Sequence, residues 1–327
     1  MHVDLEPRTL AGTDLTVGRL ILGTLMFGWQ IDAPEATRIV ERSRELGVTM
    51  VDTANAYAGG RSEEIVGAAV KPFRDEVQIA TKVGDKGDVA PEHRGLGRSA
   101  ILGSVDASLA RLGTDVIDLL YLHKPDRDVP IEESLEALDE VVRAGKVRHV
   151  AHSNYAAWQA ADMLCLCERH GWVQPRVSQQ LYHLLARRLE DEYVECSLHH
   201  GLSDVVYNPL AGGLLTGKYR FDAPPPDDTR YGIRREWGLR YWHDTNIAAV
   251  DELTRIAEDA GMSLLELSLR WLLSRPVVDH VVVGVSSVAQ LEANVAAVDG
   301  PAPDEATDAR IDEVWETLRG VALAYNR

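Results

Sequence analysis

Short apolar runs alternate with longer amphipathic stretches along most of the chain. The runs are rich in Val, Ile and Leu and are bounded by glycine or polar residues, which is typical of buried β-strands. The longer stretches place apolar residues at helical spacing. This pattern predicts strands within residues 19–24, 48–52, 77–84, 116–123, 147–154, 176–182, 204–210 and 281–286, each followed by a helix.

Strands that alternate with helices form right-handed parallel βαβ units. One predicted helix shows the usual start and stop signals, with Pro130 near its beginning and Gly145 just past its end. Eight such units predict a (β/α)8 TIM barrel, whose typical size of ~250 residues leaves part of this chain for additions. We expect these to be an N-terminal β-hairpin within residues 6–18, a Pro-rich loop between Tyr219 and Asp244, and extra helices from Ser263 to Ser274 and from about Asp304.

The competing architecture is an open, doubly wound sheet that binds a nucleotide. Such a sheet usually carries GxGxxG after its first strand, whereas LGTLMFG here offers only Gly23 and Gly28. No low-complexity linker divides the chain. We therefore expect a single barrel domain spanning residues 1–327.

Composition narrows the classes of function. The 327 residues are 45% hydrophobic and carry 34 Lys and Arg against 51 Asp and Glu, a formal charge of −17. This charge repels a nucleic-acid backbone, so general nucleic-acid binding is not expected. The sequence shows no membrane span and no signal segment at its start, which makes a cytoplasmic location the default. Cys165, Cys167 and Cys196 are interpreted as packing residues rather than as a disulfide framework or zinc site.

Polar and titratable side chains stand at the ends of the predicted strands. In a barrel the C-terminal strand ends form the active site, and a purely structural barrel would not need polar residues there. Each residue alone has an ordinary interpretation: Lys82 as a surface lysine, for example, or His123 as a hydrogen-bonded core histidine. The strand-end residues are Asp52, Tyr57, Lys82, His123, Ser153, Asn154, Gln179 and Tyr207.

Four of these residues together indicate a proton-transfer device. The phenol of a tyrosine has an unperturbed pKa near 10, which is high for acid–base catalysis at neutral pH. A lysine beside Tyr57 would lower that pKa, and Asp52 behind Lys82 would keep the lysine charged and in place. Tyr57 could then protonate a carbonyl oxygen while His123, as a neutral donor, polarises the same carbonyl. This chemistry requires no metal.

The motifs VDTANAY, ATK, DLLYLHKPD, VAHSN, VSQQLYH, YNPLAGGLLTGKY and GVSSVAQLEAN occur in this order. In order and spacing the sequence resembles the aldo-keto reductase superfamily, from about Leu5 to at least Val298. The resemblance implies that Asp52, Tyr57, Lys82 and His123 form the catalytic tetrad of that family. It is closest to the branch that includes bacterial reductases and potassium-channel β subunits.

The same resemblance implies a nicotinamide cofactor, generally NADPH, bound across the barrel mouth without a Rossmann domain. Ser153, Asn154 and Gln179 match residues that hold the carboxamide, and Tyr207 matches the ring stacked on the nicotinamide. The remaining residues that it implies for cofactor binding are Gly23, Thr24, Leu25, Asp52, Asn208, Pro209, Leu210, Ala211, Gly212, Lys218, Arg230, Gly284, Ser286, Gln290 and Asn294.

The adenosine-phosphate motif departs from the best-known members of the family. Those carry a lysine near Gly284 and an arginine at the position of Gln290, and this chain has neither. The related branch with G-x-S and Gln retains NADPH, although it usually has Glu where Ala293 stands here. NADPH is therefore the expected cofactor, with NADH as the alternative.

The intact His123 favours carbonyl–alcohol chemistry, because family members that reduce carbon–carbon double bonds replace it with Glu. The expected substrate is a small carbonyl compound: an aldehyde, a ketone or a keto-sugar. Tyr57, His123, Phe27 and Trp29 are expected to contact it, and further candidates for the pocket rim are Leu25, Met26, His93, Arg94, Tyr231, Trp237, Tyr241 and Trp242. Packing of the aromatic residues onto the barrel is the alternative interpretation.

Two other classes of function remain as alternatives. A metal-dependent barrel hydrolase could use Asp52, His123 and His152, but the first strand lacks the HxH pair common in such sites. A nicotinamide-nucleotide-sensing protein would bind the cofactor and show little turnover. The sequence does not indicate an oligomeric state.

Overall fold

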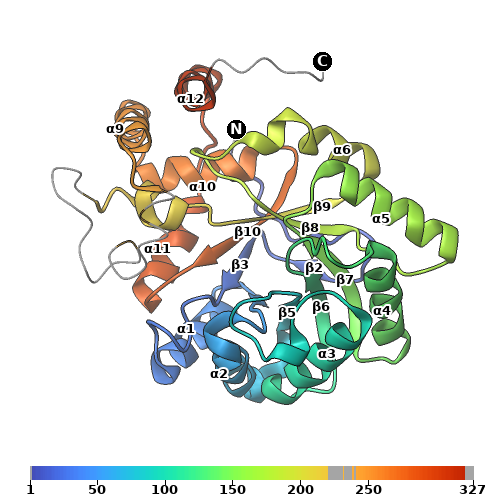
Figure 1. The fold of residues 1–327 in the computed structure, drawn as a ribbon. Helices are drawn as coiled ribbons and strands as arrows, with labels where there is room; N and C mark the ends of the chain where they lie inside the picture. The colour runs from blue at the N-terminus through green and yellow to red at the C-terminus, as the bar shows by residue number, and fades with distance from the viewer. Residues whose placement is uncertain (1, 220–230, 232–237, 239–240, 321–327) are drawn as a thin grey trace.

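Eight parallel strands close into a barrel (Figure 1) in this computed structural model, which describes residues 2–219, 231, 238 and 241–320. The strands follow one another around the barrel in chain order, and the last pairs with the first. This confirms the predicted (β/α)8 TIM barrel. In order, the strands are β3 (Leu20–Gly23), β4 (Met50–Asp52), β5 (Gln78–Val83), β6 (Ile117–Leu122), β7 (Val147–Ser153), β8 (Val177–Leu181), β9 (Ser203–Tyr207) and β10 (Val278–Gly284).

Helices surround the barrel (Figure 1), and some of them begin at side-chain caps. Asp32 accepts from the Glu35 N–H at 2.9 Å and starts the first helix. Ser263 and Glu266 form a reciprocal capping box before another. The surrounding helices are α1 (Ala33–Glu45), α2 (Arg61–Val70), α3 (Arg98–Leu112), α4 (Ile131–Arg143), α5 (Ala157–His170), α6 (Tyr193–His200), α10 (Leu264–Ser274) and α11 (Val288–Val298).

The predicted N-terminal hairpin is present and closes one end of the barrel. Strands β1 (Arg8–Thr9) and β2 (Thr16–Val17) pair antiparallel. The Ala11 N–H donates to Ser203 Oγ at 2.9 Å, at the first residue of β9. The hairpin therefore covers the N-terminal end of the strands, and the opposite end is left for the site.

Two helices lie beside each other outside the barrel (Figure 1): α9 (Asp244–Asp259) and α12 (Glu305–Arg319). The C-terminal helix was predicted, whereas α9 was not. The α9 sequence buries Val250, Leu253 and Ala257 on one face, a spacing that is helical in retrospect. Most of the predicted Pro-rich loop before α9 lies outside the described residues.

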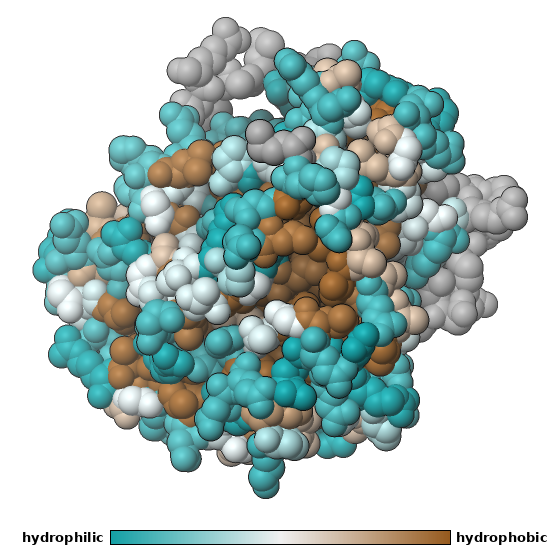
Figure 2. All heavy atoms as spheres, turned by 180° about the vertical axis from the view of Figure 1, so that it is seen from behind, coloured by the Kyte–Doolittle hydropathy of each residue, from teal (hydrophilic) through white to brown (hydrophobic). Residues whose placement is uncertain are grey.

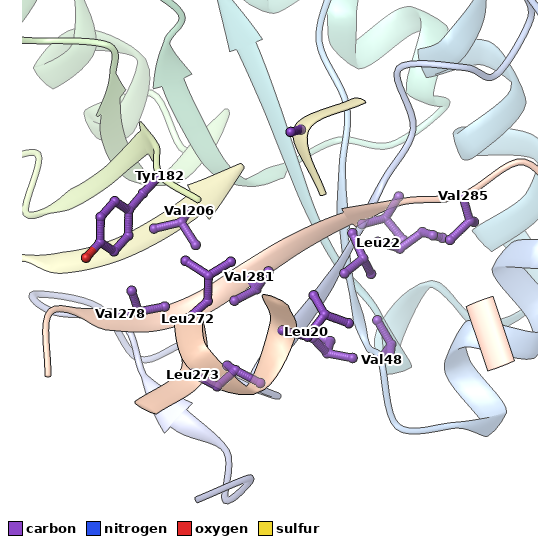
Figure 3. Packing of buried hydrophobic residues seen from close by; sticks show 14 of the residues in the cluster. Leu20, Leu22, Val48, Tyr182, Val206, Leu272, Leu273, Val278, Val281 and Val285 are labelled. Atoms are coloured by element: carbon purple, nitrogen blue, oxygen red, sulfur yellow. The ribbon is translucent and has the colours of Figure 1, made fainter. Parts of the chain in front are cut away.

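Hydrophobic side chains form two cores separated by the wall of the barrel. The inner core joins hairpin residues such as Leu10 and Val17 to inward-facing strand residues such as Met50. The outer core fills the space between strands and helices. Figure 3 shows part of it, where Leu272 and Leu273 of α10 lie beside β10. Since the strands are buried on both faces, they form near-continuous apolar runs in the sequence.

Hydrophilic residues cover much of the face shown in Figure 2. In the view of Figure 2, hydrophobic residues gather in a hollow near the middle of that face, and hydrophilic residues surround it. Within the part of the chain that the structure describes, every helix is too short or too polar to cross a bilayer.

A buried carboxyl group lies between β9 and α6. Asp204 is 3% exposed, its Oδ2 accepts from Ser197 Oγ, and its Oδ1 has no hydrogen-bond partner among the described residues. Burial raises the pKa of Asp204 to about 7, helped by the nearby Asp279. The folded protein therefore holds a proton here that the unfolded chain releases near pH 4.

This proton predicts a pH-dependent stability. Because the folded pKa is the higher one, the contribution of Asp204 is fully present below about pH 4 and is lost as pH rises towards 7, by about 1.4 kcal/mol per pH unit. An Asp204→Asn variant should lack this slope. Urea unfolding of both proteins between pH 4.5 and 8 measures it. A constant difference between their free energies of unfolding across that range would contradict the assignment.

Candidate active site

A cavity of about 970 Å³ opens at the C-terminal ends of the strands. Its volume lies near the upper end of the range for ligand pockets, about 300–1,000 Å³. Loops after β3, β4, β5, β6, β7, β9 and β10 contribute to its lining. Polar strand-end residues that the sequence singled out therefore meet at one place.

A buried ion pair lies at the base of this cavity. Lys82 on β5 is 1% exposed, and its Nζ donates to Asp52 Oδ1 of the adjacent β4 and, at 2.9 Å, to the Thr53 carbonyl. The second oxygen of Asp52 accepts from Gln179 Nε2 at 2.8 Å. Burial lowers the pKa of Lys82, but Asp52 and then Tyr57 more than offset this and hold it above its ordinary value. The lysine is therefore positively charged.

Tyr57 connects this ion pair to the cavity. Lys82 Nζ donates to the Tyr57 hydroxyl at 3.4 Å, and the ring is partly exposed to the cavity. The short 3-10 turn Tyr57–Gly60 bends sharply at Ala58 and Gly59, with φ of 49° and 63°. The His123 ring meets the tyrosine edge-on, with ring centroids 5.9 Å apart. The Tyr57 hydroxyl and the His123 imidazole are thus two potential hydrogen-bond donors in the same cavity.

The net effect on the Tyr57 hydroxyl is opposite to the one expected from sequence. Burial raises the pKa of Tyr57, while Lys82 lowers it by a smaller amount. Asp52 and Asp85 add to the increase. Lys82 is paired with the Asp52 carboxylate, and the negative charge of Asp52 cancels part of the effect of Lys82 on the pKa of the phenol. In this structure Tyr57 is a protonated donor.

His123 is held in its neutral form. Burial and the nearby Lys82 lower the pKa of His123 to about 3. Its backbone N–H donates to the Val83 carbonyl at 2.8 Å, and Nδ1 is buried with no partner among the described residues. A neutral imidazole with one unpartnered ring nitrogen can form a hydrogen bond with a ligand.

The residues expected around the nicotinamide form one hydrogen-bonded group. Ser153 Oγ donates to the Gln179 carbonyl at 2.8 Å, and Asn154, with φ of 64°, donates from Nδ2 to the His123 carbonyl at 2.9 Å. The Tyr207 hydroxyl donates to Asn154 Oδ1 at 2.7 Å. All four line the cavity, although the Gln179 amide N–H is already directed to Asp52.

The residues expected along the rest of a dinucleotide lie on the β9, β10 and β3 side. One predicted residue, Ala211, is fully buried and lines no part of the cavity. Arg230 lies outside the described residues, so its predicted contact stays a prediction. The Ser286 N–H donates to Gln290 Oε1 at 2.9 Å, beside the start of α11. Those that line the cavity are Gly23, Thr24, Leu25, Asn208, Pro209, Leu210, Gly212, Lys218, Gly284, Ser286, Gln290 and Asn294.

Only some of the residues expected to contact the substrate line the cavity. Trp29 lines the cavity with Met26, whereas Phe27 is fully buried in the outer core and does not reach it. Phe27 follows Met26 directly, but the loop turns its side chain away from the cavity and into the protein. His93 and Arg94 lie away from the cavity, and the rim aromatics Tyr231 and Tyr241 are buried, which favours their packing role.

Two carboxylates were missed in the sequence. Asp85 and Asp88, in the loop after β5, line the cavity. They follow Lys82 closely in the chain, so the rule that strand-end loops form the site would have found them.

Nothing in the described residues forms a group of three His, Cys, Asp or Glu side chains able to hold a metal. His152, which the sequence offered as a residue of a metal-dependent hydrolase, is buried and does not line the cavity. Its Nε2 lies 3.3 Å from the Tyr193 hydroxyl oxygen.

Comparison of the sequence with those of known proteins finds relatives that match nearly the whole chain. The sequence profile of the Aldo/keto reductase family matches residues 19–316. The chain is 35% identical over 327 residues to human aflatoxin B1 aldehyde reductase member 2, with 94% of this chain and 89% of that protein covered. It is 34% identical to human aldo-keto reductase family 7 member A3, covering 94% and 96%. It is also 34% identical to a probable voltage-gated potassium channel subunit beta of Arabidopsis thaliana, covering 90% and 92%.

The chain belongs to the aldo/keto reductase family. This membership and the aldehyde-reductase relatives support an oxidoreductase that reduces carbonyl compounds with a nicotinamide cofactor.

The buried ion pair predicts a strong stability effect. Lys82→Met leaves Asp52 buried and uncompensated, which should cost about 3–5 kcal/mol of unfolding free energy. The double variant Asp52→Asn/Lys82→Met removes both charges and should recover most of that loss. Chemical denaturation of the two single variants and the double variant measures it, and strictly additive losses would contradict a coupled pair.

Proposed function

We propose that this protein reduces an aldehyde, ketone or keto-sugar carbonyl to the alcohol with NADPH, and that Tyr57 is the general acid. The observation that carries the proposal is the continuous contact from Asp52 through Lys82 to the Tyr57 hydroxyl, with His123 beside it. When bound, the nicotinamide supplies the hydride that the carbonyl carbon receives.

Tyr57 supplies the proton to the carbonyl oxygen. It is protonated before reaction, and Lys82 at 3.4 Å stabilises the phenolate that forms as the proton leaves. Asp52 keeps Lys82 in place and charged through the reaction. The raised pKa keeps Tyr57 protonated until a basic alkoxide develops on the substrate, and Lys82 offsets part of the cost of releasing the proton.

His123 orients the carbonyl. As a neutral ring it donates one hydrogen bond without competing for the proton that Tyr57 transfers. Its depressed pKa, about 3, keeps it neutral over the working range of pH. Its titration should therefore not change the rate between pH 5 and 9.

The residues present fit a nicotinamide dinucleotide. A Cβ at Gly23 would lie 2.8 Å from Val282 Cγ1, so a larger residue would need Val282 to shift, and the glycine lines the cavity with its backbone. Asn154, Ser153 and Tyr207 would hold the nicotinamide end. The start of α11, with Ser286 and Gln290 lining the cavity, would hold the adenosine end, because the positive end of a helix dipole attracts phosphate.

Removal of the phenol tests the proposal. Tyr57→Phe should lower kcat for aldehyde reduction by about 100-fold or more, since general acids contribute about 10²–10⁴. Its Kd for NADPH should stay within about 2-fold, because the ring remains. Steady-state rates on a panel of aldehydes, ketones and keto-sugars, with cofactor titration by fluorescence, measure both quantities.

A nucleotide-sensing protein is the second candidate, favoured by the likeness to a probable channel β subunit. That function would show tight NADPH binding and negligible turnover in the unsubstituted protein with every carbonyl of the panel. Equal turnover by the unsubstituted protein and Tyr57→Phe would instead remove Tyr57 from its proposed role.

Cofactor preference has its own test. Gln290→Glu retains an oxygen that accepts from Ser286 and adds one negative charge beside the expected 2′-phosphate. The Kd for NADPH should rise about 10-fold, whereas that for NADH should change little. Equal changes in the two constants would place the phosphate elsewhere.

A further inference from the structure

Two carboxylates form the wall of the cavity beside the proposed acid. Asp85 is partly buried and fixed, since its Oδ1 accepts from the Gly87 N–H at 2.7 Å and its Oδ2 from Lys124 Nζ at 3.0 Å. Its charge acts on both Tyr57 and His123. Asp85 lines the same cavity as Tyr57 and His123, the two residues that would face a substrate carbonyl.

Asp88 extends this wall towards solvent. It is exposed, and both carboxylate oxygens lie 4.0 Å from the position that a Cβ would take on Gly59, in the turn that begins with Tyr57. No ion pair or hydrogen bond to its side chain occurs among the described residues. Asp88 thus presents an uncompensated negative charge above the turn that carries the acid.

On the acidic side the cations Lys82 and Lys124 are each paired with a carboxylate, and the cation that lines the cavity is on the opposite side. Of the described residues that line it, Lys218 alone is cationic, and it follows β9. In the closed barrel order, β9 is diametrically opposite β5, whose loop carries the two acids. An anionic dinucleotide is attracted to the β9 side and repelled from the β5 side, which leaves the acidic wall to the substrate.

A third part of the cavity wall, formed by the loop after β3, is apolar. Met26 and Trp29, from the loop after β3, line the same cavity. A flat apolar side chain combined with carboxylate acceptors suits a molecule that has C–H faces and several hydroxyl donors.

From this arrangement we infer that Asp85 and Asp88 determine specificity: they accept hydrogen bonds from a neutral polyhydroxylated carbonyl substrate, such as an aldose or keto-sugar, and reject carboxylate-bearing carbonyls. The inference rests on the proposed carbonyl reduction and adds its substrate class.

Charge rejection is tested with 4-nitrobenzaldehyde and 4-carboxybenzaldehyde, which differ in charge at the same ring position. The nitro group also activates the carbonyl, so the diagnostic quantity is the change of the kcat/KM ratio of the two compounds among variants at low salt. Asp88→Asn should reduce that ratio about 3- to 10-fold, and Asp85→Asn should do the same. Added salt should reduce the ratio in the unsubstituted protein, because screening weakens repulsion between exposed charges.

Hydroxyl recognition is tested with glyceraldehyde and propanal. Asp88→Ala should lower kcat/KM for glyceraldehyde about 3- to 10-fold, the usual effect of one hydrogen bond, and leave that for propanal unchanged. Hydroxyacetone and aminoacetone separate hydroxyl acceptance from simple attraction of a cation. Asp88→Ala should lower kcat/KM for hydroxyacetone as well as for aminoacetone, and a loss confined to aminoacetone would overturn the hydroxyl assignment.

The exposed Glu41 on α1, outside the cavity, provides the matched control: Glu41→Gln removes one negative charge and should leave all these ratios unchanged. Equal ratios in all variants, with turnover abolished by Tyr57→Phe, would overturn this inference alone. Turnover that is insensitive to Tyr57→Phe would overturn the proposed function instead.

Discussion

The ion pair between Lys82 and Asp52 is the constraint on which the rest of the site depends. Both side chains are almost completely buried inside the barrel, where an isolated charge would be very unfavourable. Each charge is therefore compensated by the other and by fixed hydrogen bonds to the Thr53 carbonyl and the Gln179 amide. Any rearrangement of β4, β5 or β8 would leave a buried charge without a partner.

The barrel makes this arrangement possible because it holds adjacent strands in a fixed register. Asp52 pairs with Ala80, two residues before Lys82, so the aspartate and the lysine both point inward at neighbouring levels. The hairpin fills the opposite end with apolar side chains, so the polar groups can contact a ligand only at the C-terminal end of the barrel. Tyr57 and His123 lie at that end.

The distribution of charge around the cavity adds a second level of organisation. Although the chain carries a formal charge of −17, Lys218 stands on the β9 side and the acids on the β5 side. A local donor set can therefore attract an anionic cofactor to one half of the mouth while the other half remains negative. Net charge alone, read from composition, contains no such information.

Several residues show where sequence reasoning was insufficient. The position of Phe27 depends on how the loop after β3 turns its side chains, which has no fixed periodicity outside a strand. The pKa of Tyr57 depends on burial and on Lys82 being already paired, and neither is visible in the order of residues. Helix α9 has a helical pattern of buried residues, but it follows a segment that carries no strand signal.

The sequence by itself determined the alternation of strands and helices, the closed barrel and the identity of the strand-end residues, because hydrophobic periodicity and residue type are local properties. Only the tertiary structure decided which of those residues touch, which are buried and which charges face one another across the cavity. These are distances between residues far apart in the chain. MVDTANAY at residues 50–57 contains the proposed acid, Tyr57, and the carboxylate of Asp52, but the lysine that joins them comes from the next strand.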